Sequence, residues 1–286
     1  MTSPRTLLTA WELHAKKQFG QNFLTDPATP EMIVRRSGLM PGDVVFEIGA
    51  GLGALTVPSA RVAERVYAVE RDPHLIPLLR NELLAAGVLD KVEIIHDDIL
   101  AVDLPAIASH HKGKIRVMGN LPYNISSQIL IWLVRSRQCV DKAVFMFQKE
   151  LAERIVAPPG AKDYGRLSAV IQYCAEIRTI ARIGSGQFFP KPAVDSEVIE
   201  IDFSGKPDHP ARDEAFLFDV IKAAFGKRRK NLKNSLTSSQ LGIEQDQMLI
   251  ALDKASIDYH RRAETLTILE FVTLSNHLLD CPRAAP

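Results

Sequence analysis

The sequence lacks the features that mark membrane, secreted and metal-binding proteins. No apolar segment approaches the ~20 residues that span a bilayer, and the first twenty residues contain no continuous apolar run of signal-peptide length. The three cysteines, Cys139, Cys174 and Cys281, are far apart, odd in number and without zinc-like spacing. We therefore expect a cytoplasmic protein with reduced thiols, no disulfide and no metal.

The chain also has little net charge. Its 35 Lys and Arg against 34 Asp and Glu leave a formal charge of +1 over 286 residues. Such a value is too small to attract nucleic acid through the overall field, so any surface of that kind must come from local segregation of charge. With 46% hydrophobic and 24% charged residues, the composition is that of a globular protein with one large domain and a smaller one.

What the sequence does contain is an alternation of two kinds of segment, without internal repeats. Segments with helical periodicity separate five short runs rich in Val, Ile and Phe, at residues 43–49, 65–70, 91–96, 114–120 and 141–147. This order predicts an α/β fold in which helices wrap a parallel sheet. Residues 175–183 and 193–203 then alternate on either side of a turn-forming segment, which predicts an antiparallel pair at the sheet edge.

A change of pattern follows "SGKPDHPAR". Residues 213–225, 242–255 and 265–279 all have helical periodicity, and no strand pattern follows them. We therefore expect an α/β domain over residues 1–206 and a small all-helical C-terminal domain over residues 207–286.

The stretch "EIGAGLGALT" is the first chemical signal. Gly49, Gly51 and Gly53 follow a strand and open a helix, and Glu70 ends the next strand, where an acid commonly accepts hydrogen bonds from ribose hydroxyls. This pattern predicts a nucleotide-type cofactor. Because Gly49-x-Gly51-x-x-Ala54 also fits a dinucleotide loop, an oxidoreductase stays open, as does a tight turn without a ligand.

Two acids end the third predicted strand, in "HDDILAVDL". A carboxylate of Asp97 or Asp98 at this position could accept a hydrogen bond from an adenine amino group, or it could cap the following helix. We assign the adenine contact to Asp98.

The stretch "GNLPYNIS" follows the fourth strand, at the edge where open α/β sheets bind ligands. The exocyclic amine of adenine is a poor nucleophile until acceptors draw on its N–H bonds. Asn120 offers a side-chain oxygen, and Pro122 fixes the chain so that the Leu121 carbonyl is a second acceptor. Tyr123 would stack on the base. The alternative is a capped turn in which Ser126 starts a helix and Tyr123 packs on the core.

Six spaced motifs together resemble the ribosomal RNA adenine dimethyltransferases, and most closely those of the small subunit. The resemblance runs from about residue 16 into "FGKRRKNLKNSL". It rests on "FGQNFL", "EIGAGLGALT", "GNLPYNIS", "MFQKELAERI", "YGRLS" and "FFPKPAVDSEVI". It implies a Rossmann-like sheet that binds S-adenosyl-L-methionine, and an enzyme that places two methyl groups on each of two adjacent adenosines. Those adenosines lie in the 3'-terminal hairpin loop of 16S ribosomal RNA.

The resemblance and the motifs together give a set of candidate site residues. The cofactor contacts are Asn22, Leu24, Gly49, Gly51, Glu70, Asp98 and Asn120. The groups that hold the target adenine are Asn120, Leu121, Pro122 and Tyr123, with Phe188 facing the base from the other side. The resemblance further implies a monomer that acts on a pre-assembled small ribosomal subunit, with a role in the biogenesis of that subunit.

A cluster of basic residues near the start of the helical domain is the candidate RNA surface. No acid interrupts it, and it comprises Lys222, Lys227, Arg228, Arg229, Lys230 and Lys233. A solvated helical face would explain such a run, but the interleaved Asn231 and Asn234 suit phosphate and sugar contacts. We favour RNA binding, with further cations near the cofactor site (Lys16, Lys17) and near the target loop (Arg135, Arg137).

Three alternatives to a small-subunit enzyme are open. A 23S ribosomal RNA dimethyltransferase would share most motifs, although that group is commonly more basic and lacks the "KRRKNLKNSL" block. A non-catalytic RNA-binding assembly factor or mitochondrial transcription factor could share the fold, although the intact segment 120–123 argues against lost catalysis. A dinucleotide oxidoreductase has no evident use for that segment.

Overall fold

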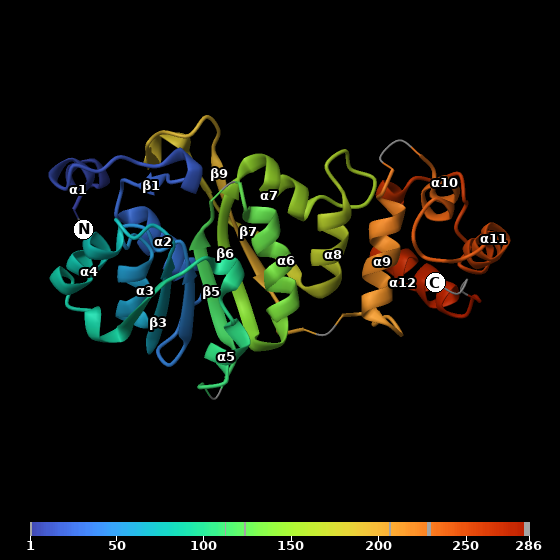
Figure 1. Ribbon diagram of the computed structural model, residues 1–286, viewed down its shortest axis with the longest axis horizontal. Helices are drawn as coiled ribbons and strands as arrows, with labels where there is room; N and C mark the ends of the chain where they lie inside the picture. The colour runs from blue at the N-terminus through green and yellow to red at the C-terminus, as the bar shows by residue number, and fades with distance from the viewer. Residues whose placement is uncertain (1, 112, 123, 206, 228–229, 283–286) are drawn as a thin grey trace. The chain divides into compact units, whose positions relative to one another are not determined.

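A seven-stranded sheet organises most of the chain in the computed structural model, which describes residues 2–111, 113–122, 124–205, 207–227 and 230–282 (Figure 1). Its strand order is β4-β3-β2-β5-β6-β9-β7. In that order the strands are Val92–His96, Arg65–Glu70, Val44–Ile48, Ile115–Asn120, Val140–Gln148, Ser196–Asp202 and Glu176–Ile183. The strands β4, β3, β2, β5 and β6 are parallel to one another. β9 is antiparallel to both of its neighbours, β6 and β7. The predicted parallel sheet and its antiparallel edge pair are therefore confirmed.

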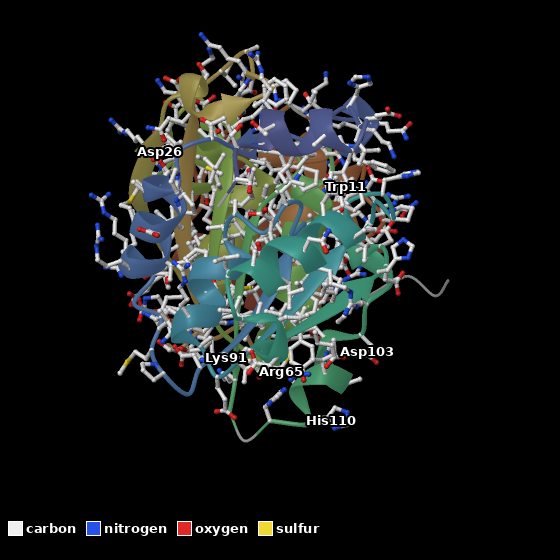
Figure 2. The ribbon with its side chains drawn as sticks, turned by 90° about the vertical axis from the view of Figure 1, so that its left-hand side faces the viewer. Trp11, Asp26, Arg65, Lys91, Asp103 and His110 are labelled. Carbon is white, nitrogen blue, oxygen red and sulfur yellow. The ribbon has the colours of Figure 1, made fainter. Side chains whose placement is uncertain are left out.

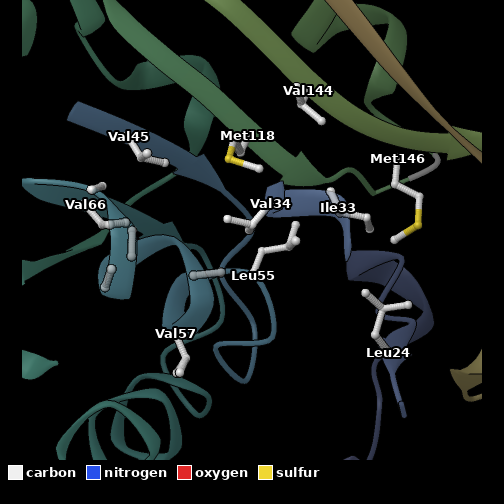
Figure 3. Packing of buried hydrophobic residues seen from close by; sticks show 14 of the residues in the cluster. Leu24, Ile33, Val34, Val45, Leu55, Val57, Val66, Met118, Val144 and Met146 are labelled. Carbon is white, nitrogen blue, oxygen red and sulfur yellow. The ribbon is translucent and has the colours of Figure 1, made fainter. Parts of the chain in front are cut away.

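Helices cover both faces of this sheet. On one face, Val45, Val66 and Met118 pack with Ile33 of α2 (Ala28–Arg36) and Val57 of α3 (Thr56–Val62) (Figure 3). α4 (Ile76–Ala85) adds leucines to the same cluster. On the other face, Phe46 stacks against Trp132 of α6 (Ser126–Ser136), with 6.0 Å between the ring centroids. A short helix, α5 (Leu104–Ala108), precedes β5 in the chain. Neighbouring residues of one strand point to opposite faces of the sheet. Because helices cover both faces, both sets of residues are buried, and the strands are continuous hydrophobic runs.

The N-terminal segment lies at the carboxyl edge of the sheet. Arg65 and Lys91, at the amino ends of β3 and β4, appear on one side of Figure 2, and Trp11 and Asp26 appear on the opposite side. Trp11 follows α1 (Pro4–Ala10), and Asp26 follows β1 (Phe23–Leu24). β1 pairs with β8 (Phe188–Phe189) in a separate two-stranded sheet. The segment between Trp11 and Asp26 therefore borders the edge where parallel strands present ligand sites.

Backbone contacts divide the chain into two compact units. The first comprises residues 1–152 and 176–204, and the second comprises residues 153–175 and 205–286. α7 (Lys149–Val156) contains the first point of division. The second unit contains α8 (Arg166–Cys174), α9 (Glu214–Ala224), α10 (Leu232–Thr237), α11 (Gln245–Lys254) and α12 (Ile268–Leu279).

The second unit is helical, as the periodicity after residue 207 predicts, but it also takes in α8. Tyr173 of α8 meets Phe218 of α9 edge to face at 5.9 Å, and its hydroxyl accepts a hydrogen bond from the Ala211 amide at 3.2 Å. At the start of α12, the Thr267 hydroxyl accepts from the Glu270 amide while the Glu270 carboxylate accepts from the Thr267 amide. This reciprocal cap satisfies two backbone donors and fixes where the last helix begins.

Neither a membrane-spanning helix nor a metal-binding cluster is found in the described ranges. None of the helices there is both long and apolar enough to cross a bilayer. No group of three or more His, Cys, Asp or Glu side chains in those same ranges is arranged to hold a metal ion.

Candidate functional site

A cavity at the carboxyl edge of the sheet brings the predicted cofactor residues together. All seven line it, namely Asn22, Leu24, Gly49, Gly51, Glu70, Asp98 and Asn120. They come from β1, from the loop after β2 and from the ends of β3, β4 and β5. The parallel arrangement of the central strands is what places residues so distant in sequence around one space.

Two glycines allow the backbone to pass close to its neighbours here. Gly51 has a φ of +57°, and a Cβ at this position would lie 3.2 Å from the Phe23 ring. Gly119, near the end of β5, is more constrained, because a Cβ there would lie 2.6 Å from the Ile48 carbonyl oxygen. A larger residue at position 51 would displace the Phe23 ring, and one at position 119 would force the ends of β2 and β5 apart.

Glu70 is held rigidly at the end of β3. One carboxylate oxygen accepts from the Gly51 amide at 2.8 Å, and the other accepts from the Asp72 amide at 2.8 Å. Burial raises the pKa of Glu70 above its ordinary value, although both amides favour the charged form. The Glu70 side chain thus holds the glycine loop in place through the Gly51 amide, and it also lines the cavity.

Glu47 is a cavity residue that motif reasoning missed. It lies in β2 with 2% of its surface exposed, and it lines the same cavity as Glu70. Burial raises its pKa to about 8; the Thr56 hydroxyl moderates the rise, and the charge of Glu70 adds to it. Among the described residues, neither Oε2 of Glu47 nor Oγ1 of Thr56 makes a hydrogen bond of acceptable geometry, so the Thr56 hydroxyl acts on Glu47 only through its proximity. The available signal was a single acid inside the otherwise apolar strand "VVFEI".

Asp98 fills one of the two roles that the sequence left open, the helix cap, and it also lines the cavity. Its Oδ1 accepts from the Leu100 amide at 3.1 Å and so caps a short 3-10 helix, as the alternative interpretation expects. Its Oδ2 lies 3.1 Å from the Arg71 guanidinium, and the residue also lines the cavity. Asp97, its neighbour, lines the cavity as well and accepts from the Asp98 amide at 2.7 Å. The adenine contact of Asp98 stays a prediction.

Residues 16–24, which we name the N-terminal cover, border the cavity and are anchored to Asp72. Lys16 Nζ and Gln21 Nε2 each donate to the Asp72 carboxylate at 2.9 Å. Burial by itself would raise the pKa of Asp72, but these donors and the His74 amide outweigh it and lower the pKa below its ordinary value. Asp72 is 1% exposed, so it is a fixed internal anchor for the cover.

The cover also determines the orientation of Asn120. Asn120 Nδ2 donates to the Asn22 carbonyl oxygen at 2.8 Å. Because that carbonyl can only accept, the amide nitrogen must face it, and Oδ1 is the remaining acceptor of the side chain. The following residues are fixed too, since the Leu121 amide donates to Met146 of β6 at 3.3 Å and the Ser126 hydroxyl donates to the Pro122 carbonyl at 2.8 Å.

The remaining predicted adenine-binding residues are distributed differently. Pro122 lines the cavity, and Leu121 is buried beside it. Phe188 does not line the cavity; it is 4% exposed, pairs with Leu24 and belongs to the buried cluster under the sheet. Tyr123 lies outside the described residues. The base contact of Phe188 and the stacking role of Tyr123 stay predictions.

The described basic residues of the second unit have different surroundings. Lys227 lines a separate cavity of that unit, and Lys230 is exposed. Lys233 lies with its ammonium 5.8 Å from the centre of the Tyr259 ring. Arg228, Arg229 and the side chain of Lys17 lie outside what the structure describes.

The expectation that Arg135 and Arg137 lie near the target loop is wrong. α6 begins just after that loop and runs back along the sheet for eleven residues. Arg137 is close in sequence to Val140, which is in register with Ile115 at the amino end of β5, whereas Asn120 is in register with Met146. Both arginines therefore lie toward the opposite edge of the sheet.

The charge of the cavity distinguishes between the cofactor classes. Among the described lining residues, the carboxylates of Glu70, Asp97 and Asp98 and the protonated carboxyl of Glu47 face the single guanidinium of Arg71. A cationic cofactor suits these groups, whereas the pyrophosphate of a nicotinamide dinucleotide would add two negative charges to them. The residues present fit a sulfonium cofactor of the S-adenosylmethionine type.

Comparison with known proteins agrees with this geometry. Residues 12–274 match the family model for ribosomal RNA adenine dimethylase. A ribosomal RNA small subunit methyltransferase A from Desulforapulum autotrophicum is 50% identical over 278 residues, which cover 97% of each chain. The protein of the same name from Alkaliphilus metalliredigens is 38% identical and covers 96% of this chain and 95% of its own.

Solved structures agree on the fold. A dimethyladenosine transferase from Plasmodium falciparum matches with a TM-score of 0.73 at 23% identity, over 88% of this chain and 95% of its own. A 23S rRNA methyltransferase matches with a TM-score of 0.67 at 24% identity, over 90% of this chain and 100% of its own. The predicted Rossmann-like methyltransferase fold is confirmed.

Proposed function

The chain belongs to the ribosomal RNA adenine dimethylase family, and from this membership we propose that it dimethylates N6 of two adjacent adenosines in the 3'-terminal hairpin loop of 16S ribosomal RNA. Its small-subunit relatives at 50% and 38% identity support 16S over 23S RNA as the substrate. The observation that carries the chemistry is the fixed amide of Asn120, whose nitrogen is engaged by Asn22 and whose oxygen remains to accept.

The protein is an S-adenosylmethionine-dependent methyltransferase. When bound, the cofactor supplies an electrophilic methyl group on a positively charged sulfur. We assign the cofactor ribose to Glu70 and its adenine to Asp98, as the resemblance implies, and we add the Glu47 carboxyl as an acidic group on the same wall of the cavity. The glycine loop brings backbone close to this space, and residues 18–24 of the N-terminal cover line it.

Asn120 and Leu121 prepare the target amine. The Oδ1 atom of Asn120 and the carbonyl oxygen of Leu121 would accept the two N–H bonds of the adenine amine and turn its lone pair toward the methyl donor. The amine loses a proton only after it has gained the methyl group, so no strong general base is required. Tyr123 and Phe188 would hold the flipped base by stacking, in which each contact contributes about 1–3 kcal/mol.

The helical second unit is proposed to bind ribosomal RNA, through Lys227, Arg228, Arg229, Lys230 and Lys233. We further propose that the protein works as a monomer in the cytoplasm, on a pre-assembled small ribosomal subunit, and that it contributes to the biogenesis of that subunit. The names of its relatives support the ribosomal substrate class.

Mass spectrometry of nucleosides tests the proposal. Small-subunit particles and 23S RNA, each lacking the modification, are incubated with the protein and S-adenosylmethionine, then digested and analysed. We expect two N6,N6-dimethyladenosines for each 16S RNA and none from 23S RNA. Dimethylation of 23S RNA alone would identify the large-subunit alternative. A protein that binds both cofactor and RNA without methylating either RNA would support the non-catalytic factor.

A further inference from the structure

A second cavity is lined only by residues of the helical unit, none of which is assigned to catalysis. It has a volume of about 640 Å³. Its walls come from the start of α8, the C-terminal half of α9, the residues just after α9, and the segment from α10 to Leu241. It therefore gathers side chains from both of the chain segments that build this unit.

The cavity concentrates positive charge that the protein leaves unneutralised. Arg166, Lys222 and Lys227 line it, while Asp219 is the one acid among its described lining residues. Three cations and one carboxylate give a formal charge of +2. Within the described ranges, none of these three cations has a carboxylate oxygen within 4.0 Å. All three cations are exposed, so their summed positive field favours the approach of an anion to this cavity.

Ser235 adds an independent sign that a ligand completes this cavity. It lines the space with 2% of its surface exposed, and its hydroxyl oxygen is buried without a hydrogen-bond partner among the residues described. The other two serines of the wall differ, because Ser238 donates to Asn234 and Ser239 donates to Leu236 at 2.7 and 2.5 Å. A buried hydroxyl without a partner is costly, so Ser235 is suited to donate to a ligand oxygen.

We propose that this cavity binds a phosphodiester group of the RNA substrate, between Arg166, Lys222 and Lys227 and with a hydrogen bond from Ser235. This inference rests on the proposed function and assigns a defined phosphate site to the helical unit. It differs from a simple basic run in two respects. It includes Arg166, which lies far earlier in the chain, and it excludes Lys233, which is stacked on Tyr259.

The salt dependence of RNA binding tests the site. Arg166→Gln and Lys222→Gln should each weaken binding of small-subunit RNA and lower the slope of log affinity against log salt by about 0.7–0.9, the value of one lost phosphate contact. The loss of affinity should be about threefold larger at 50 mM than at 200 mM salt. Lys254→Gln is the matched control, because Lys254 is an exposed lysine at the end of α11 that does not line the cavity.

Ser235→Ala separates the hydrogen bond from the charge. This variant should weaken RNA binding severalfold at every salt concentration without changing the slope, and its thermal stability should be equal to or above that of the wild type, because no hydrogen bond of the free protein is lost. The inference is wrong if Arg166→Gln and Lys222→Gln have the same slope as Lys254→Gln, or if Ser235→Ala binds RNA like the wild type.

The failure of this inference can be distinguished from the failure of the proposed function. If the wild type methylates 16S RNA but the cavity variants bind RNA normally, only the phosphate site is refuted. If the wild type binds RNA with the predicted salt dependence but transfers no methyl group, the catalytic proposal is refuted and the site stands. Binding of S-adenosylmethionine, measured by calorimetry, checks that each variant retains its α/β unit.

Discussion

Replacing Glu47 by glutamine should stabilise the protein, and the gain should grow with pH. The ordinary pKa of this carboxyl is 4.5, and burial raises it to about 8 in the folded protein. The folded chain therefore retains a proton that the unfolded chain releases between these pH values. The stability of the wild type is fully present below pH 4.5 and decreases as the pH rises toward 8. Glutamine has nearly the same shape and does not titrate, so it removes this linkage.

The magnitude follows from the width of that window. Each pH unit between the two pKa values costs the wild type about 1.4 kcal/mol of its free energy of unfolding. The variant should therefore exceed the wild type by less than about 1 kcal/mol at pH 5 and by about 3 kcal/mol at pH 7. Urea denaturation of both proteins at pH 5, 6, 7 and 8 measures the difference. Glu197→Gln is the control, because this buried strand glutamate lies 3.1 Å from Arg182, so its replacement breaks an ion pair and should not stabilise the protein.

The protonation of Glu47 should also make the binding of S-adenosylmethionine depend on pH. A cationic ligand favours the ionised form of a neighbouring carboxylate, so the affinity of the wild type for S-adenosylmethionine should rise between pH 6 and 8 with release of a proton. Calorimetry in two buffers of different ionisation enthalpy measures that proton. A difference in stability between the variant and the wild type that stays constant from pH 5 to pH 8 would refute the assignment of a neutral Glu47.

Three further substitutions test the site. Glu70→Ala should weaken S-adenosylmethionine binding by about 1.5–3 kcal/mol in calorimetry, since charge-assisted hydrogen bonds are lost, and wild-type affinity in a folded variant would contradict its role. Asn120→Ala should lower the single-turnover rate at saturating RNA, and a normal rate would exclude the contact between Asn120 and the amine. Phe188→Leu, a mild change that suits the buried position of Phe188, should mainly weaken RNA binding. Asp72→Asn should weaken the Lys16 contact and make residues 16–24 more sensitive to protease, while unchanged cleavage would show that other contacts hold the N-terminal cover.

Local signals in the sequence were enough for the sheet and for the residues that meet around the cavity at its carboxyl edge. The strands from β2 to β6 are short apolar runs, and the glycine loop and Glu70 occupy fixed positions relative to strand ends. The pairing of β1 with β8 could not be predicted, because strands of two residues have no periodicity and their partners are distant in the chain. The anchoring of the N-terminal cover by Asp72 was missed for the same reason, since the acid and its donors meet only in the folded protein.

Electrostatic roles were harder to predict than positions. Glu47 stands in the sequence as one acid in an apolar strand, and only its burial reveals an altered pKa. The error over Arg135 and Arg137 came from reading closeness in sequence as closeness in space. A helix that leaves the carboxyl edge of a parallel sheet carries its last residues to the other edge within three turns.

The interrupted path of the chain through its two units has a consequence for how it folds during synthesis. α8 leaves the ribosome before β7 and β9, and its buried residues Ala169, Ile171 and Tyr173 must wait for α9, about forty residues later, before their partners exist. The sheet likewise lacks its antiparallel edge until residue 202 has been made. A chain cut after Ser204 would therefore complete the sheet but leave an apolar helix uncovered, and it should aggregate. Replacing residues 153–175 by a short polar linker in the same truncated chain should restore a dispersed catalytic unit.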